Sequence, residues 1–134
     1  MSVISETGRD QRQHPRIKVP AMYTLIRARI LGSNRYNWTG HIYDVSLGGV
    51  RFELDMPIEV GTELEIRGML PGSGHTTFRA VGRVVRVHTE EGDHGPAIMG
   101  LQFESFQSPM DRHRLAQYID ARAKAQQTAL RRAA

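Results

Sequence analysis

The chain has 134 residues, of which 40% are hydrophobic and 24% charged, a size and balance that suit one globular domain. It contains no cysteine, which excludes disulfides, thiolate catalysis and cysteine-bound zinc. The net charge of +4 favours anionic partners, and every basic residue except Lys18 and Lys124 is arginine, whose planar fork suits phosphates and guanine edges.

The beginning of the chain predicts an arm rather than a folded element. Residues 1–18 have no periodic apolar pattern, so we expect a flexible N-terminal arm. The polar start MSVISETGRDQRQ lacks the apolar core of a secretory signal, and no apolar run in the chain is long enough to cross a bilayer. These features predict a cytoplasmic protein that does not insert into a membrane.

The middle of the chain, residues 19–107, predicts β-strands. In MYTLIRARIL (22–31), apolar and charged residues nearly alternate, which predicts a half-buried strand. The residues expected to face inward there are Tyr23, Leu25, Ala28 and Ile30, among outward Arg27 and Arg29. Further strands are predicted at 36–45, 49–54, 63–70, 77–90 and 98–106.

Alternation and turn signals within these segments predict how they fold together. Gly82 interrupts the long segment and predicts a bulge where the inward set changes. About six strands joined by short turns favour an antiparallel barrel or sandwich, and the lack of βαβ alternation argues against a Rossmann-like sheet. Five apolar residues are expected to point into the core: Val50, Phe52, Leu54, Leu64 and Ile66.

The segment 108–134 changes to helical spacing. Ser108 is the expected N-cap, with Pro109 in the first helical position and Asp111 in the first turn. The tail after Ala123 has little to bury, so we expect it either to fray or to meet a partner. The apolar stripe that should dock on the β-structure consists of Leu115, Tyr118 and Ile119.

Signatures of catalysis are missing from the sequence. It has no phosphate-binding loop, no dinucleotide fingerprint and no identifiable acid/base pair, and Ser46 lacks the nucleophile-elbow setting. His88 and His94 flank an acidic stretch at 90–93, which we interpret as a solvated hairpin tip rather than a metal site. The sequence therefore predicts a protein that is not an enzyme and holds no metal.

Two stretches remain as candidate binding residues, and the first is RDQRQHPRIKVP (9–20). Arg12 and Arg16 stand four positions apart just before the first strand. Their guanidinium groups can grip phosphates bidentately, hydrogen-bond O6 and N7 of guanine, or stack on its ring. Taken alone, the stretch is better explained as a solvated basic arm.

The second stretch is DVSLGGV (44–50). Asp44 and Ser46 alternate with apolar residues, so both should lie on the outer face of a strand, where the carboxylate can accept from N1–H and N2–H of guanine. Gly48 and Gly49 allow positive φ and a close approach of ligand to backbone. Taken alone, the stretch is also compatible with a plain turn in which Asp and Ser cap backbone amides.

In combination, the two stretches resemble the PilZ domain family. The resemblance is carried by Arg-x-x-x-Arg at Arg12 and Arg16, then Asp-x-Ser-x-x-Gly at Asp44, Ser46 and Gly49. The later GLQFESF (100–106) and the helix after it are also similar to that family, and the likeness spans about residues 9–122.

The resemblance implies a six-stranded antiparallel β-barrel at 19–107 with a C-terminal helix, and cyclic di-GMP as ligand. It implies that Arg12 and Arg16 hold phosphate and guanine, that Asp44 and Ser46 bind a guanine, and that Gly49 shapes the turn. Many members carry an arginine where this chain has Gln11, so the number of ligand molecules bound stays open. Secondary candidates for the ligand site are Arg9, Gly48 and Arg86.

The function implied by the resemblance is that of a receptor. Cyclic di-GMP would order the arm against the barrel and change a surface that an unidentified protein partner recognises. The family implies motility, secretion or polysaccharide machinery as the setting. One alternative is a PilZ-like adaptor that binds no nucleotide, against which the intact motifs argue. Another is a barrel for single-stranded nucleic acid, which the few aromatic residues disfavour.

Overall fold

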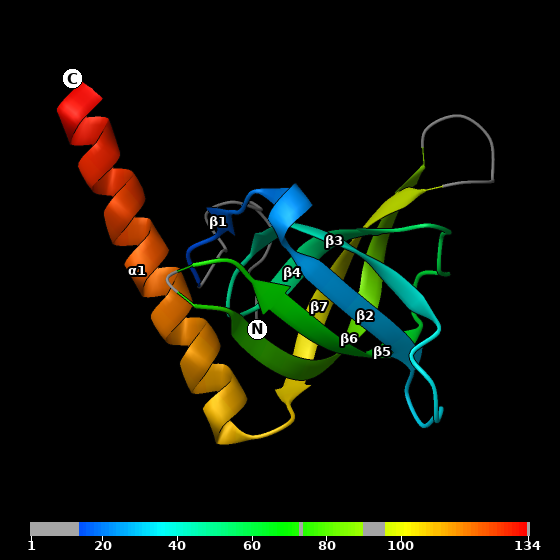
Figure 1. The fold of residues 1–134 in the computed structure, drawn as a ribbon. Coiled ribbons are helices and arrows are strands. Elements are labelled where there is room, and N and C mark those ends of the chain that lie inside the picture. The colour runs from blue at the N-terminus through cyan, green and yellow to red at the C-terminus, as the bar shows by residue number, and fades with distance from the viewer. Residues whose placement is uncertain (1–13, 73, 90–95, 134) are drawn as a thin grey trace, which may run out of the picture.

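The computed structural model describes residues 14–72, 74–89 and 96–133 (Figure 1). Beyond a two-residue strand at the start and one short 3-10 helix, the chain folds into six longer strands and one long helix. The elements are β1 (Ile17–Lys18), η3 (Ala21–Tyr23), β2 (Leu25–Ile30), β3 (Trp38–Val45), β4 (Gly49–Leu54), β5 (Glu63–Leu70), β6 (Thr76–Thr89), β7 (Ala97–Phe106) and α1 (Pro109–Ala133).

The six longer strands form a closed antiparallel barrel, as predicted. The sheet runs β3-β2-β5-β6-β7-β4, and pairing between β3 and β4 joins its two ends. The additional strand β1 pairs with the end of β3, placing Lys18 opposite Asp44. The end of the N-terminal arm therefore lies beside the first residue of the DVSLGGV stretch.

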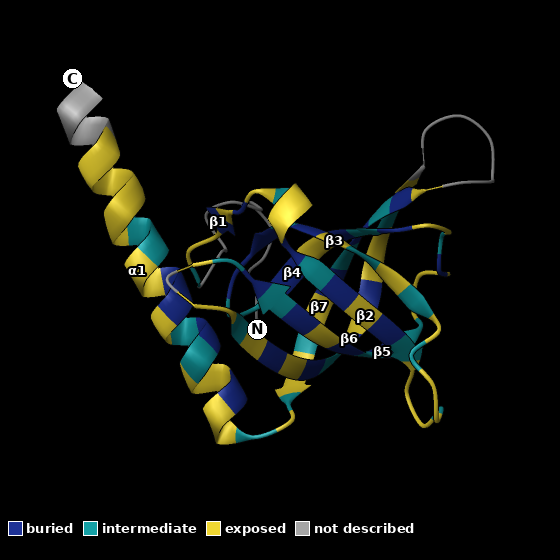
Figure 2. Cartoon of the chain, in the orientation of Figure 1, coloured by how far each residue is buried: buried dark blue, intermediate teal, exposed yellow. Residues whose placement is uncertain are grey.

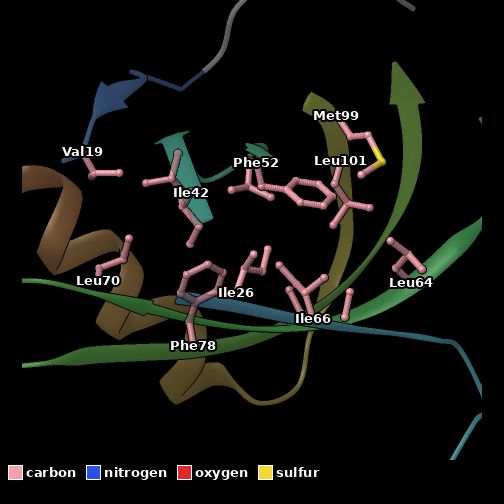
Figure 3. Packing of buried hydrophobic residues seen from close by; sticks show 14 of the residues in the cluster. Val19, Ile26, Ile42, Phe52, Leu64, Ile66, Leu70, Phe78, Met99 and Leu101 are labelled. Carbon is pink, nitrogen blue, oxygen red and sulfur yellow. The ribbon is translucent and has the colours of Figure 1, made fainter. Parts of the chain in front are cut away.

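The barrel interior is filled by the inward residues of every long strand (Figure 3). Phe52 and Phe78 are its largest fully buried side chains, and the predicted inward residues of β4 and β5 are all buried. Alternation places their outward neighbours in solvent because successive side chains of a strand point to opposite faces. The barrel wall thus has an outer face available for binding.

The inward set predicted for the first strand was partly wrong. The regular alternation of β2 buries Ile26 and Ala28, whereas Leu25 lies on the opposite face and is half-buried. Ile30 shares the inward face but ends the strand and is 39% exposed, and Tyr23 belongs to η3 and is 67% exposed. Pairing with β5 determines which residues of β2 point inward, since Ala28 lies opposite the buried Ile66.

The described strand pairs contain three register shifts, and one lies at Gly82, where the sequence predicted a bulge. The expected change of the inward set at Gly82 was wrong, because burial continues at every second residue from Phe78 to Val84 and the set changes at Val85. The register of β6 against β7 shifts between Val81 and Gly82, and a Cβ on Gly82 would lie 2.4 Å from the carbonyl oxygen of Gln102. A second shift in β6 precedes Arg86, and a third in β3 precedes Asp44. Two residues of the predicted site therefore follow bulges, which are known to re-aim side chains.

Helix α1 begins as predicted, with Ser108 before its first turn. The Ser108 hydroxyl donates to Oδ2 of Asp111 at 2.6 Å, and the Asp111 N–H donates back to Ser108 Oγ at 3.3 Å. Oδ1 of Asp111 accepts from the backbone N–H of Arg79 at 2.9 Å and from Arg114 Nη2 at 3.0 Å. Asp111 thereby ties the start of the helix to β6.

The predicted apolar stripe docks the helix on the barrel. Leu115, Tyr118 and Ile119 are buried, whereas the later turns of α1 extend away from the barrel and are mostly exposed (Figure 2). At 3.3 Å, Gln126 Nε2 donates to the carbonyl oxygen of Lys18, which links the outer part of α1 to β1. In the part of the chain that the structure describes, no helix is both long and apolar enough to span a membrane.

Stability is expected to depend on pH through Asp111. Burial alone would raise its pKa, but the Ser108 hydroxyl, the Arg79 N–H and the Arg114 charge outweigh burial and lower it. A lowered folded-state pKa gives stability that is present above the unfolded value, about 3.9, and is lost as pH falls through the folded value. Asp111→Asn should therefore cost about 1–3 kcal/mol of unfolding free energy at pH 7.

Urea unfolding at several pH values tests this expectation. The difference between wild type and Asp111→Asn should stay constant from pH 7 to about 5 and shrink below about 4. Asp120→Asn is the matched control, since Asp120 is exposed and, among the described residues, its one ion pair is with Lys124 on the same helix. A pH-independent difference for Asp111→Asn would show that its charge does not contribute.

Candidate functional site

A groove of about 500 Å³ crosses the outer face of β4, β7 and β6 at the end where β1 joins β3. We call it the motif groove, because the Ser46–Gly49 loop and Arg16 line it. Strands β4, β6 and β7 all contribute residues to its lining. Charged or polar side chains at its edge are His14, Arg16, Arg51, Arg86, His88 and Gln102.

Asp44 is held between two arginines at the rim of the groove. Its Oδ1 accepts from Arg16 Nη1 at 3.0 Å, and its Oδ2 accepts from Arg51 Nε at 2.7 Å. Asp44 is only 4% exposed, but the two guanidinium side chains that cover it are 36% and 46% exposed. The carboxylate therefore lies on the outer side of the barrel wall, beneath the arginines, and orients both.

Ser46 organises the loop that follows. It is buried, and its Oγ accepts from the backbone N–H of Gly48 at 3.1 Å, while its own N–H donates to the Gly49 carbonyl at 2.9 Å. The Gly48 carbonyl in turn accepts from the Phe103 N–H at 2.9 Å, which fixes the loop to β7. The capping role that the sequence allowed for Ser46 is thus present, and Ser46 also lines the groove.

Neither glycine of the loop has the positive φ that the sequence allowed, and only Gly49 serves a close approach of two strands. Positive φ occurs among the described residues at Gly32 and Gly61, not at Gly48 or Gly49. A Cβ on Gly49 would lie 2.4 Å from the carbonyl oxygen of Leu101, which β4–β7 pairing brings alongside. A Cβ on Gly48 would meet only His14 Cδ2 at 3.4 Å and Ser46 Oγ at 3.7 Å.

A row of three residues crosses the groove floor. Gly100 of β7 pairs with Arg51 of β4 on one side and with Arg86 of β6 on the other. Two strand spacings of about 4.8 Å separate the two arginine backbones, and the glycine between them leaves the floor bare. This geometry brings Arg86, a secondary candidate from the sequence, into the same groove as Arg16 and Ser46.

Arg51 is the groove residue that sequence reasoning missed. It sits two positions after Gly49, and its outward parity between buried Val50 and Phe52 was the available signal. Its guanidinium lies over the ring of Tyr43 at 5.7 Å, and the Tyr43 hydroxyl donates to Glu53. That hydrogen bond is the main reason that the pKa of Tyr43 is raised, with Arg51 opposing it.

Arg9, Arg12 and the adjoining Gln11 lie outside the described residues. Within the described ranges, no cluster of three or more His, Asp or Glu side chains is arranged to hold a metal ion.

Comparison with known proteins identifies the fold and the family. The family model described as "PilZ domain" matches residues 10–121. Similar solved structures include the inhibitor of motility MotI of Bacillus subtilis, with a TM-score of 0.65 at 18% identity over 85% of this chain and 52% of that one. The PilZ domain of Escherichia coli YcgR with cyclic di-GMP matches with a TM-score of 0.57 and 21% sequence identity, over 89% of this chain and 97% of that one.

A third similar structure is the complex of MrkH from K. pneumonia with cyclic di-GMP, with a TM-score of 0.63 at 22% identity. It is matched over 87% of this chain and 55% of that one, so the chain spans about half the length of MotI and MrkH. No curated protein matches the sequence. Because the PilZ model covers most of the chain and the barrel has the expected topology, the chain belongs to the PilZ domain family.

Proposed function

We propose that this protein is a cytoplasmic receptor for cyclic di-GMP, not an enzyme, and that the motif groove is its ligand site. The observation that carries the proposal is the convergence of Arg16, Arg51 and Arg86 on one groove beside the Ser46–Gly49 loop. Its volume of about 500 Å³ falls within the usual range for small-ligand sites. Family membership and the ligand named for the YcgR and MrkH structures support the same assignment.

The proposed roles follow from the chemistry of the groove. Arginine side chains bind phosphate through charge-assisted, often bidentate hydrogen bonds, and their flat faces stack on purine rings. Arg16 and Arg51 each have nitrogens beyond the one bonded to Asp44 that remain able to donate to a ligand. Gly100 leaves space between Arg51 and Arg86 in which a guanine ring can lie. Arg12 and Arg9 of the arm would complete the site.

The structure changes the role that we propose for Asp44. From the sequence alone, its carboxylate was expected to bind a guanine edge directly. With both oxygens bonded to guanidinium groups, Asp44 is better suited to positioning Arg16 and Arg51, and Ser46 to shaping the loop. A direct bond to guanine would have to use the second lone pair of a carboxylate oxygen, at a residue that is only 4% exposed beneath the two arginines.

We propose that ligand binding acts on a partner through the arm. Arg16 adjoins β1, and β1 contacts both the end of β3 and, through the Lys18 carbonyl, Gln126 of α1. Ligand that holds the arm against the barrel would therefore fix a surface shared by β1 and the outer part of α1. The partner that reads this surface would be a protein.

Calorimetric titration tests the ligand assignment. The protein is expected to bind cyclic di-GMP with saturable heat, whereas a single-stranded oligonucleotide should bind weakly and lose affinity steeply as salt rises. Arg16→Ala should weaken cyclic di-GMP binding by about tenfold or more, because a charge-assisted hydrogen bond contributes about 1.5–3 kcal/mol. Arg27→Ala is a control, since this exposed arginine lies on β2, away from the groove. Absence of saturable binding by the wild type would refute the assignment.

A further inference from the structure

A second groove lies between α1 and the beginning of β6, on a part of the molecule that shares no residue with the motif groove. We call it the helix groove. In Figure 1 the turn that joins β5 to β6 reaches the middle of α1, where this groove is found. Its volume is about 490 Å³, and its polar lining includes His75, Thr76, Arg114, Gln117, Tyr118 and Arg122.

The charge of the helix groove has one sign. None of its described lining residues is acidic, while Arg114 and Arg122 contribute two guanidinium groups. Arg114 is held in place, because its Nε donates to the Thr77 carbonyl at 3.0 Å and its Nη2 to Asp111 at 3.0 Å. Arg122 forms no ion pair with an acidic group of the described chain. The groove therefore attracts negative charge through Arg122.

Two buried donors at this groove lack acceptors. The Tyr118 hydroxyl and Arg122 Nε are both covered from solvent and make no hydrogen bond to any described group, although Tyr118 as a whole is only 8% exposed. They stand four residues apart on α1, so they lie on the same helix face. Buried polar groups are nearly always satisfied in folded proteins, so an acceptor is missing here. Burial also raises the pKa of the Tyr118 hydroxyl, which stays a donor at neutral pH.

We propose that the helix groove is an oxyanion site that receives a phosphate or carboxylate group. The acceptor oxygens of such a group match the two unsatisfied donors, which the Tyr118 and Arg122 side chains would turn toward the groove to meet it. The negative charge of the group matches Arg122 and Arg114. Rotation of the half-buried Arg122 side chain would bring its donors to the group. The site would give the protein a second point of recognition on α1, independent of the motif groove.

Nuclear magnetic resonance of the arginine side chains tests this site. The Nε–H resonances of Arg114 and Arg122 are followed while inorganic phosphate, or separately glutarate, is added at constant ionic strength. Saturable shifts are expected, with affinity lowered about tenfold by Arg122→Gln and reduced by Tyr118→Phe. Lys124→Gln removes the same charge from an exposed position outside the groove and should leave the affinity unchanged.

The two probes separate the sources of the oxyanion. Tighter binding of phosphate would assign a phosphorylated ligand, whereas equal or tighter binding of glutarate would assign an acidic side chain of a protein. Shifts that grow linearly with either probe, or an affinity that Arg122→Gln does not change, would overturn the site and leave ordered water as the acceptor. Amide spectra of each variant establish that the fold is kept, and Arg16→Ala should not alter the titration.

Discussion

Replacing Asp44 by alanine is expected to lower the affinity for cyclic di-GMP by about tenfold to a hundredfold. The carboxylate accepts one hydrogen bond from Arg16 and one from Arg51, so its loss frees both guanidinium groups from their orientation. Because both arginines are partly exposed, water can solvate them, and the melting temperature should change by only a few degrees. Calorimetry with cyclic di-GMP, beside a thermal melt, measures the two effects.

A double-mutant cycle decides how Asp44 acts. If Asp44 works by positioning Arg51, then Asp44→Ala combined with Arg51→Ala should lose less affinity than the sum of the two single changes. If Asp44 binds guanine directly, the losses should add. Asp55→Ala is the matched control, because this exposed carboxylate follows β4 and lies outside the motif groove. Undiminished affinity in Asp44→Ala would remove Asp44 from the site.

Substituting Gly49 by alanine is expected to destabilise the barrel itself, by about 1–3 kcal/mol of unfolding free energy. The added methyl group would lie 2.4 Å from the Leu101 carbonyl oxygen, a backbone atom held by the β4–β7 pairing. That contact is too short to survive, so the two strands must separate locally. Urea unfolding gives the loss directly, and any fall in ligand affinity should accompany it.

The adjacent glycine provides the comparison for this effect. Gly48→Ala would place its methyl group 3.4 Å from His14 and 3.7 Å from Ser46 Oγ, contacts that a small shift of side chains relieves. Its unfolding free energy should stay within about 0.5 kcal/mol of the wild type. Equal stability of the two variants would show that the strand contact at Gly49 is not what requires glycine there.

Much of the fold could be predicted from local sequence patterns. Alternation in 49–54 and 63–70 identified the inward residues, because it depends on neighbours within a few residues. Gly82 marked the place of a register shift, but the inward set of β6 changes at Val85, where pairing with β7 decides it. The start of α1 was equally predictable, since Ser108 and Asp111 form hydrogen bonds with each other across one helical turn. Which residues of β2 point inward could not be predicted, because LIRARI has apolar residues on both faces. Only pairing with β5 selects Ile26 over Leu25 for the core.

The sequence by itself determined an antiparallel β-domain with a C-terminal helix, because alternation and capping are local properties of residue order. The spacing of Arg12, Arg16, Asp44, Ser46 and Gly49 added the family resemblance, and that resemblance implied the closed barrel and the nucleotide site. Tertiary structure alone decided what each residue contacts: strand pairing brings Arg51, Gly100 and Arg86 into one row, and the β1–β3 pairing brings Arg16 to Asp44. Hydrogen bonds between strands distant in the chain set these contacts, and no local pattern encodes them.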